Sequence, residues 1–160
     1  MLILRRPMRT VALFSCALAL VLLASTAWGA EPTAGTLSVE RGKGVVMVDL
    51  RGSLLGRLVT GTLRVTDTTP NDDSDIQVFG YDQKPSVRPN GTVVYSGSNI
   101  RFRLVGGAYS VAITGKGINL SAVGRGTVQG LGVTDGLFST DGQPFRSIAP
   151  SFYLDVFGTL

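Results

Sequence analysis

The stretch "RFRLVGGAYSVAITGKGINLSAVGRG", from Arg101 to Gly126, contains the two patterns that decide the fold. Apolar and polar residues alternate along it, so that Phe102 and Leu104 share one face of an extended chain and the arginines at 101 and 103 share the other. A period of two with one apolar face is typical of half-buried strands in antiparallel sheets. Glycines interrupt this alternation at intervals of nine residues, at Gly97, Gly106, Gly115 and Gly124.

The glycine interval indicates how the strands are connected. A strand of about seven residues followed by a two-residue turn has this period, and glycine is favoured where a tight hairpin needs a positive φ. We therefore interpret "TGKG" (114–117) and "VGRG" (123–126) as turns on either side of a strand, 118–123. Similar alternation recurs in "GRLVTGTLRVT" (56–66) and "SFYLDVFG" (151–158).

These patterns predict an all-β domain with no helix beyond the N-terminal segment. We expect an antiparallel β-sandwich or barrel of about nine to eleven short strands. A short β-solenoid without calcium is the alternative. A calcium-binding nonapeptide solenoid is excluded because it needs an Asp in each repeat, and no acid occurs between Asp82 and Asp135.

The first 29 residues have the composition of a secretory signal peptide. A basic head with three arginines is followed by an apolar run over 11–24, and small residues precede a cleavage point after Gly29. The apolar run is short for a membrane span, which needs about 20 residues. We expect residues 1–29 to be removed on export. Residues 30–160 then form a single domain without a membrane span, secreted or associated with the cell envelope.

Removal of this segment limits the chemistry that the chain can offer. Three of the 15 bases leave with it, so the formal net charge falls from +4 to +1. The only Cys (Cys16) and the only Trp (Trp28) also leave, and the chain has no His. These absences exclude a Ser-His-Asp triad, a thiolate nucleophile, a thiolate zinc site and a disulfide. We expect a non-enzymatic domain that is stabilised by its hydrophobic core.

The net charge of residues 30–160 is close to zero, but the chain contains two segments of opposite charge. Residues 67–82 have five acids and no base, whereas residues 83–134 have six bases and no acid. Arg101 and Arg103 share a strand face about 7 Å apart, which suits neighbouring phosphates or sulfates on a polymer. We expect these two arginines to lead an anion-binding face, which Lys116 and Arg125 either extend or diverge from.

The partner expected for this face is an anionic cell-wall or surface polymer. Nucleic acid is not expected, because export separates the protein from it and the net charge is small. The alternative interpretation is that these bases are solvated positions on a β-surface, partly neutralised by the acidic loop.

Two further patterns involve carboxylates. The acidic loop "DTTPNDDSDI" (67–76) offers Asp72, Asp73 and Asp75 as calcium ligands, with a solvated turn as the alternative. Asp49 and Asp155 each lie inside an apolar run, where a buried carboxylate would have a raised pKa, as in a carboxylate-based hydrolase. An outward carboxylate paired with a neighbouring base is commoner, so we assign no catalytic residue, and calcium is the one cofactor considered.

The segment "SGSNIRFRLVGGAYSVAITGKGINLSAVGRGTV" (96–128), with "GTLSVERGKG" (35–44) upstream, resembles uncharacterised exported glycine-rich all-β proteins of high-GC bacteria. The shared features are the signal, the G-[KR]-G turns and the glycine-spaced strands. The resemblance brings no activity, cofactor or functional residue. We expect an exported, non-enzymatic structural or interaction module of the cell envelope. A small-ligand-binding β-barrel is the alternative, followed by a carboxylate-based hydrolase.

Overall fold

The structure, a computed structural model, describes residues 33–70, 73–148 and 152–159. They belong to one compact unit, Pro32–Leu160, and form a single antiparallel sheet. The all-β prediction is confirmed, and the described part of the chain contains no helix that is long and apolar enough to cross a membrane. The predicted signal peptide, residues 1–29, lies outside the described residues, as does Asp72. The strands are β1 (Gly35–Asp67), β2 (Asp75–Phe79), β3 (Ser86–Val87), β4 (Val93–Thr140), β5 (Arg146–Ser147) and β6 (Phe152–Phe157).

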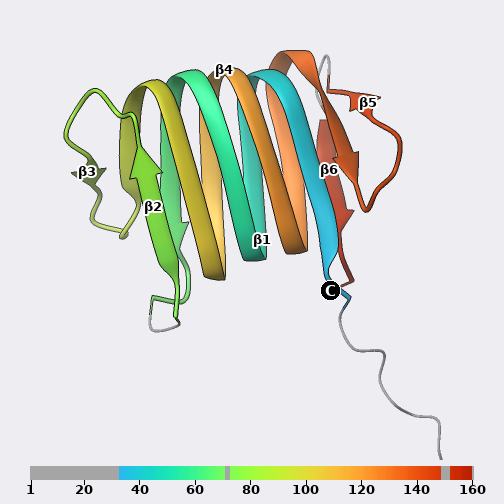
Figure 1. Ribbon diagram of the computed structural model, residues 1–160, viewed down its shortest axis with the longest axis horizontal. Coiled ribbons are helices and arrows are strands. Elements are labelled where there is room, and N and C mark those ends of the chain that lie inside the picture. Colours follow the sequence, from blue (N-terminus) through green and yellow to red (C-terminus); the bar gives the residue numbers. More distant parts are fainter. Residues whose placement is uncertain (1–32, 71–72, 149–151, 160) are drawn as a thin grey trace, which may run out of the picture. The chain divides into compact units, whose positions relative to one another are not determined.

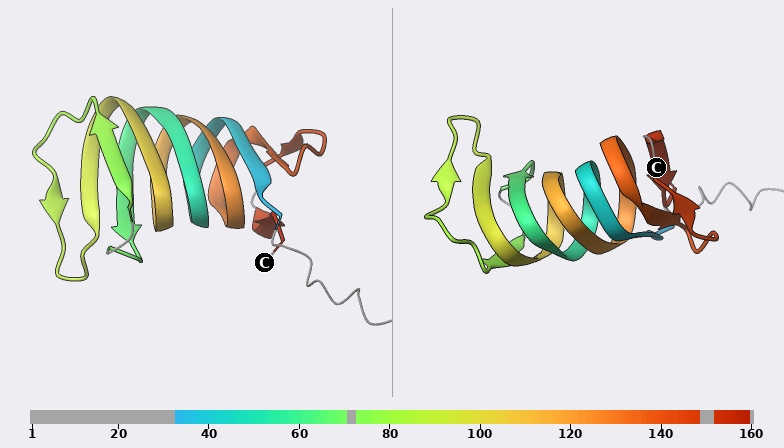
Figure 2. Two further views of the ribbon diagram at one scale, coloured as in Figure 1. Left: turned by 60° about the horizontal axis from the view of Figure 1, so that its bottom comes forward. Right: turned by 90° about the horizontal axis from the view of Figure 1, so that it is seen from above.

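Two long strands, β1 and β4, form most of the sheet by winding around each other (Figure 1). Most residues of β1 pair with β4 at both edges. Gly52, for example, lies opposite Gly107 on one side and Gly124 on the other. The chain therefore coils, as in the solenoid alternative, but neighbouring turns come from different strands and run antiparallel. Figure 2 shows the same coil from two further directions.

The coil has two faces, each made of neighbouring strand segments. The face that we call the β2 face is turned toward the viewer in Figure 1, and we call the other the β6 face. In order across the sheet, the β2 face consists of β2, residues 98–105, 53–60, 116–123, 36–43 and 135–140, and β5. The β6 face consists of β3, residues 93–96, 62–67, 108–114, 45–51 and 125–131, and β6.

Glycines form the corners at which β1 and β4 pass from one face to the other. Gly52 and Gly124 lie opposite each other with φ of +144° and +147°, a region that residues other than glycine rarely adopt. A Cβ on Gly52 would lie 2.3 Å from the carbonyl oxygen of Val123. The two rows of paired corner glycines are Gly97, Gly61, Gly115 and Gly44, and Gly107, Gly52, Gly124 and Gly35.

These corners explain the glycine interval differently from the hairpin interpretation. The chain does not turn back at 114–117 or 123–126 but continues through both segments as β4. A corner, like a hairpin turn, needs a positive φ that favours glycine, so the local sequence signal is similar. The segments between corners have the short length predicted for strands, while the strands themselves run on from one face to the other.

The space between the two faces is filled by apolar side chains. Inward-facing residues of both long strands, such as Leu54, Leu63 and Ile113, are completely buried. Ile76 and Val78 of β2 pack against this core at one end. Tyr109 is also buried, and its hydroxyl donates a hydrogen bond of 2.7 Å to the carbonyl oxygen of Val105. Burial, and then the carboxylate of Asp67, raise the pKa of Tyr109.

Candidate anion-binding face

The two arginines expected to lead an anionic site lie on the β2 face, in the segment 98–105 of β4. Both side chains are exposed, because the alternate residues Ile100, Phe102 and Leu104 point into the core. Their surroundings differ. Arg103 donates a hydrogen bond of 3.1 Å to the carboxylate of Asp75 in β2, and both side chains are about half exposed. Arg101 has no carboxylate partner in the part of the chain that the structure describes, so of the two arginines it is the one available to a ligand.

Two bases of β1 join Arg101 because of the way the strands are paired. Arg57 lies directly opposite Arg101, and Lys43 lies directly opposite Lys116. The four residues come from four neighbouring segments of the β2 face, 98–105, 53–60, 116–123 and 36–43. The two pairs are offset along the strands, because Arg57 faces Asn119 across its other edge and Lys116 faces Thr60. The lysine pair is therefore three residues, or about 10 Å, further along the strands than the arginine pair. We call Arg101, Arg57, Lys116 and Lys43 the basic track.

Electrostatics favour a bound anion on this track. Like charges directly opposite each other in an antiparallel pair destabilise it, and the track contains two such pairs. The only ion pairs among the described residues, Arg103–Asp75 and Arg146–Asp155, do not involve the track. One carboxylate, that of Asp135, stands opposite Lys43 at its far end. An anion bound between Arg57 and Arg101 would relieve their repulsion and accept charge-assisted hydrogen bonds from both.

A shallow cleft of about 410 Å³ lies beside Arg57 and Arg101. Asn99 and Asn119 line it together with Val59 and the two arginines. The side chain of Asn119 is held in place, since its oxygen accepts from the backbone N–H of Arg41 and its amide donates to the carbonyl of Gly117. Asn99 has a φ of +59°, and its side chain has no hydrogen-bond partner in the described part of the chain.

The fourth predicted residue, Arg125, lies on the other face. The corner at Gly124 separates it from residues 116–123, and it stands opposite Arg51 of β1 on the β6 face. Both arginines line a cleft of about 330 Å³ that also includes the carboxylate of Asp49. The structure thus places Arg101 and Lys116 on one face, each in a pair of like charges, and assigns Arg125 to a separate pair on the other face.

Of the three candidate calcium ligands, the structure describes Asp73 and Asp75. Asp73 is exposed, and Asp75 binds Arg103 and accepts a hydrogen bond from the amide of Gln77. Within the segments that the structure covers, no three carboxylates are placed to hold a metal ion. Because Asp72 is outside these segments, the calcium hypothesis stays a prediction.

The two carboxylates considered for catalysis have different surroundings. Asp49 is exposed on the outer side of the β6 face, opposite Ser110 and Thr127. Asp155 forms an ion pair with Arg146 and accepts a hydrogen bond from the hydroxyl of Thr140. The first carboxylate faces solvent, and the second is engaged by a base.

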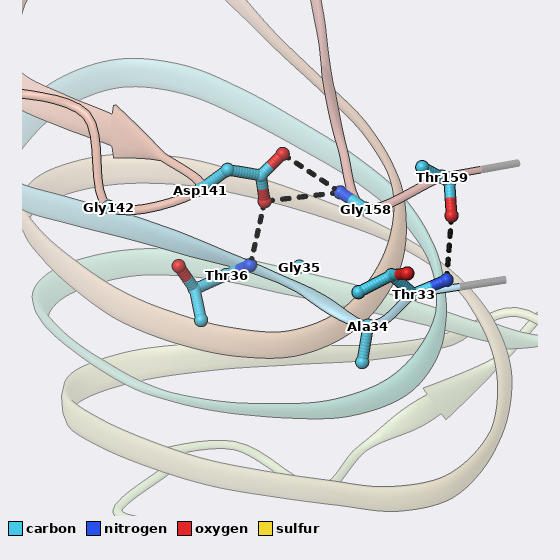
Figure 3. A pocket seen from close by; sticks show the side chains of 8 residues that line it. All are labelled: Thr33, Ala34, Gly35, Thr36, Asp141, Gly142, Gly158 and Thr159. Carbon is cyan, nitrogen blue, oxygen red and sulfur yellow. Dashed lines mark hydrogen bonds between the residues drawn. The ribbon is translucent and has the colours of Figure 1, made fainter.

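A larger cleft, of about 530 Å³, lies where the described chain begins and ends (Figure 3). The carboxylate of Asp141 accepts hydrogen bonds from the backbone N–H groups of Thr36 and Gly158, and the hydroxyl of Thr159 accepts from the N–H of Thr33. These hydrogen bonds pair the polar groups of the cleft with one another, and they form a clamp between the start of β1 and the end of β6.

Sequence reasoning missed Arg57 and Lys43. They lie in β1, far along the chain from Arg101 and Lys116, and only the pairing of β1 with β4 brings them together. The available signal was the excess of bases over 41–64, where Asp49 is the only acid. Comparison of the chain with models of protein families, with curated proteins and with solved structures gave no match.

Proposed function

We propose that this protein is an exported, non-enzymatic β-domain that holds an anionic polymer of the cell envelope on its basic track. The observation that carries the proposal is the pair Arg57 and Arg101, which are exposed, lie directly opposite each other and have no carboxylate partner among the described residues. Pairs of cations on neighbouring strands suit a repeating anion, because the backbone fixes their spacing before the ligand arrives. The secretory features of residues 1–29 support an extracellular partner.

The packed interior favours a ligand on the surface over one enclosed in the fold. Inward positions of both faces are occupied by buried apolar side chains such as Leu58, Ile100 and Val128. The clefts beside the two arginine pairs are open to solvent, and charged side chains line each of them. A small-ligand carrier would instead need an enclosed, mostly apolar pocket.

The test is equilibrium binding of the mature protein to two polyanions, long-chain inorganic polyphosphate and polygalacturonate. We expect Arg57→Gln/Arg101→Gln to weaken binding by about tenfold or more, since each arginine contributes charge-assisted hydrogen bonds. The control is Arg51→Gln/Arg125→Gln, which removes the same charge from an equivalent pair on the β6 face.

The control separates a site from a general charge effect. Binding that depends only on net charge would fall equally in both double variants, and that result would contradict the proposal. Wild-type protein that binds neither polymer at low salt would contradict it as well. Neither variant should unfold more easily than the wild type, because both remove a repulsive pair from the outer side of the sheet.

A further inference from the structure

The basic track begins beside exposed aromatic side chains. Phe79, the last residue of β2, pairs directly with Arg101, so both side chains leave the sheet on the same side. Its neighbour Val78 packs against the core, and the ring of Phe79 is left 60% exposed. Tyr81 follows at 42% exposure, and its ring lies 5.6 Å from that of Tyr95. Burial, and then the Tyr81 phenol, raise the pKa of Tyr95.

The order of these groups across the sheet indicates the kind of anion that would use all of them. Phe79, Arg101 and Arg57 occupy three consecutive strand segments, so an aromatic ring is followed by two guanidinium groups at intervals of about 4.8 Å. Lys116 and Lys43 lie on the next two segments, three residues along the strands from this line. A ligand in contact with Phe79 and both arginines is therefore an extended chain that crosses the strands.

An aromatic ring contributes to binding only when the ligand has an apolar face to cover it. The C–H face of a pyranose ring is such a surface, whereas a phosphate chain presents only oxygen. Guanidinium groups suit the carboxylates of an acidic sugar through paired hydrogen bonds. The side chain of Asn99, which lines the adjacent cleft and has no partner among the described residues, is available to a sugar hydroxyl.

We infer that the ligand of the basic track is a carboxylated polysaccharide, with a sugar ring stacked on Phe79 and carboxylates bound by Arg101 and Arg57. This inference rests on the proposed function, that the track holds an anionic polymer, and adds the chemical class of that polymer. It assigns Phe79 the role of selecting sugar over other polyanions, because the arginines alone do not distinguish a carboxylate from a phosphate.

The test compares Phe79→Leu on polygalacturonate and on polyphosphate. Leucine keeps an apolar side chain at this exposed position and removes only the flat ring, so the fold should be retained. We expect about a three- to tenfold loss of affinity for polygalacturonate and less than about a twofold change for polyphosphate. Phe79→Tyr should restore polygalacturonate binding, because it restores a ring.

Phe145→Leu is the matched control, since Phe145 is 48% exposed and lies outside the track. It should leave both affinities unchanged. Equal losses on both polymers with Phe79→Leu, or no loss on either, would overturn the polysaccharide inference and leave the proposed function standing. Binding of the wild-type protein to polyphosphate alone would also overturn the polysaccharide inference and leave the proposed function standing. Wild-type binding to neither polymer would instead overturn the proposed function.

Discussion

At the scale of single residues, the fold depends on glycines that stand opposite each other at the corners. A Cβ on Gly124 would lie 2.2 Å from the carbonyl oxygen of Arg51, just as a Cβ on Gly52 would lie 2.3 Å from that of Val123. Gly61 and Gly115 repeat this reciprocal contact at another corner. A side chain at these positions would meet both an unfavourable φ and an immovable backbone oxygen.

Gly52→Ala is the substitution that tests the corner geometry. We expect it to lower the free energy of unfolding by about 3 kcal/mol or more, because the backbone strain adds to the steric overlap. Gly91→Ala is the control, since Gly91 also has a positive φ, +80°, but nothing lies within 4 Å of its Cβ position. Its expected cost is about 1 kcal/mol. The measurement is urea denaturation of both variants. Equal losses in the free energy of unfolding for Gly52→Ala and Gly91→Ala would contradict a role for the close approach of the strands.

At the scale of strands, one end of the coil, where β1 begins and β4 and β6 end, is fastened by a side chain in place of a continuing ladder. The carboxylate of Asp141 accepts from the N–H of Thr36 at 3.0 Å and from that of Gly158 at 3.1 Å. These contacts link the start of β1, the end of β4 and the end of β6. Asp141 itself has a φ of +51°, which aspartate, asparagine and glycine tolerate better than most residues.

Asp141→Gly removes this clamp without adding backbone strain at the positive φ. We expect a loss of about 1–3 kcal/mol of stability, because two backbone N–H groups lose a charged acceptor. Amide hydrogen exchange should become faster at residues 35–37 and 156–158, while exchange in the central corners stays slow. Asp141→Asn retains an acceptor oxygen, so its stability should lie between that of the wild type and that of Asp141→Gly. Uniform acceleration along β1 and β4 would contradict a local role for Asp141.

At the same scale, the burial pattern of the strands could be predicted from the sequence, but the path of the chain after each corner could not. The alternation at Phe102 and Leu104, and at Tyr109 and Val111, correctly predicted buried and exposed faces, because side-chain direction in a strand follows from period two alone. The interpretation of Gly115 as part of a hairpin turn differed from the structure. A positive φ is a local requirement that hairpins and corners share, whereas the direction of the chain afterwards depends on which distant strand pairs with it.

At the scale of the whole sheet, the basic track results from strand register. The exposure of Arg101 and Lys116 followed from local sequence, but the position of Arg57 opposite Arg101 depends on how β1 and β4 wind around each other. A shift of one residue in this register would turn Arg57 toward the core and separate the pair. Register in a wound pair is fixed by contacts between distant residues, so no local pattern predicts it.

The most direct test of the basic track is residue-level protection of arginines in the wild-type protein. Labelling with an arginine-selective dicarbonyl reagent would be followed by mass spectrometry, with and without saturating polygalacturonate. We predict that the polymer slows modification of Arg57 and Arg101 severalfold and leaves Arg51, Arg64 and Arg125 unchanged. Equal protection of all five arginines, or selective protection of Arg51 and Arg125, would contradict the assignment of the β2 face as the binding surface.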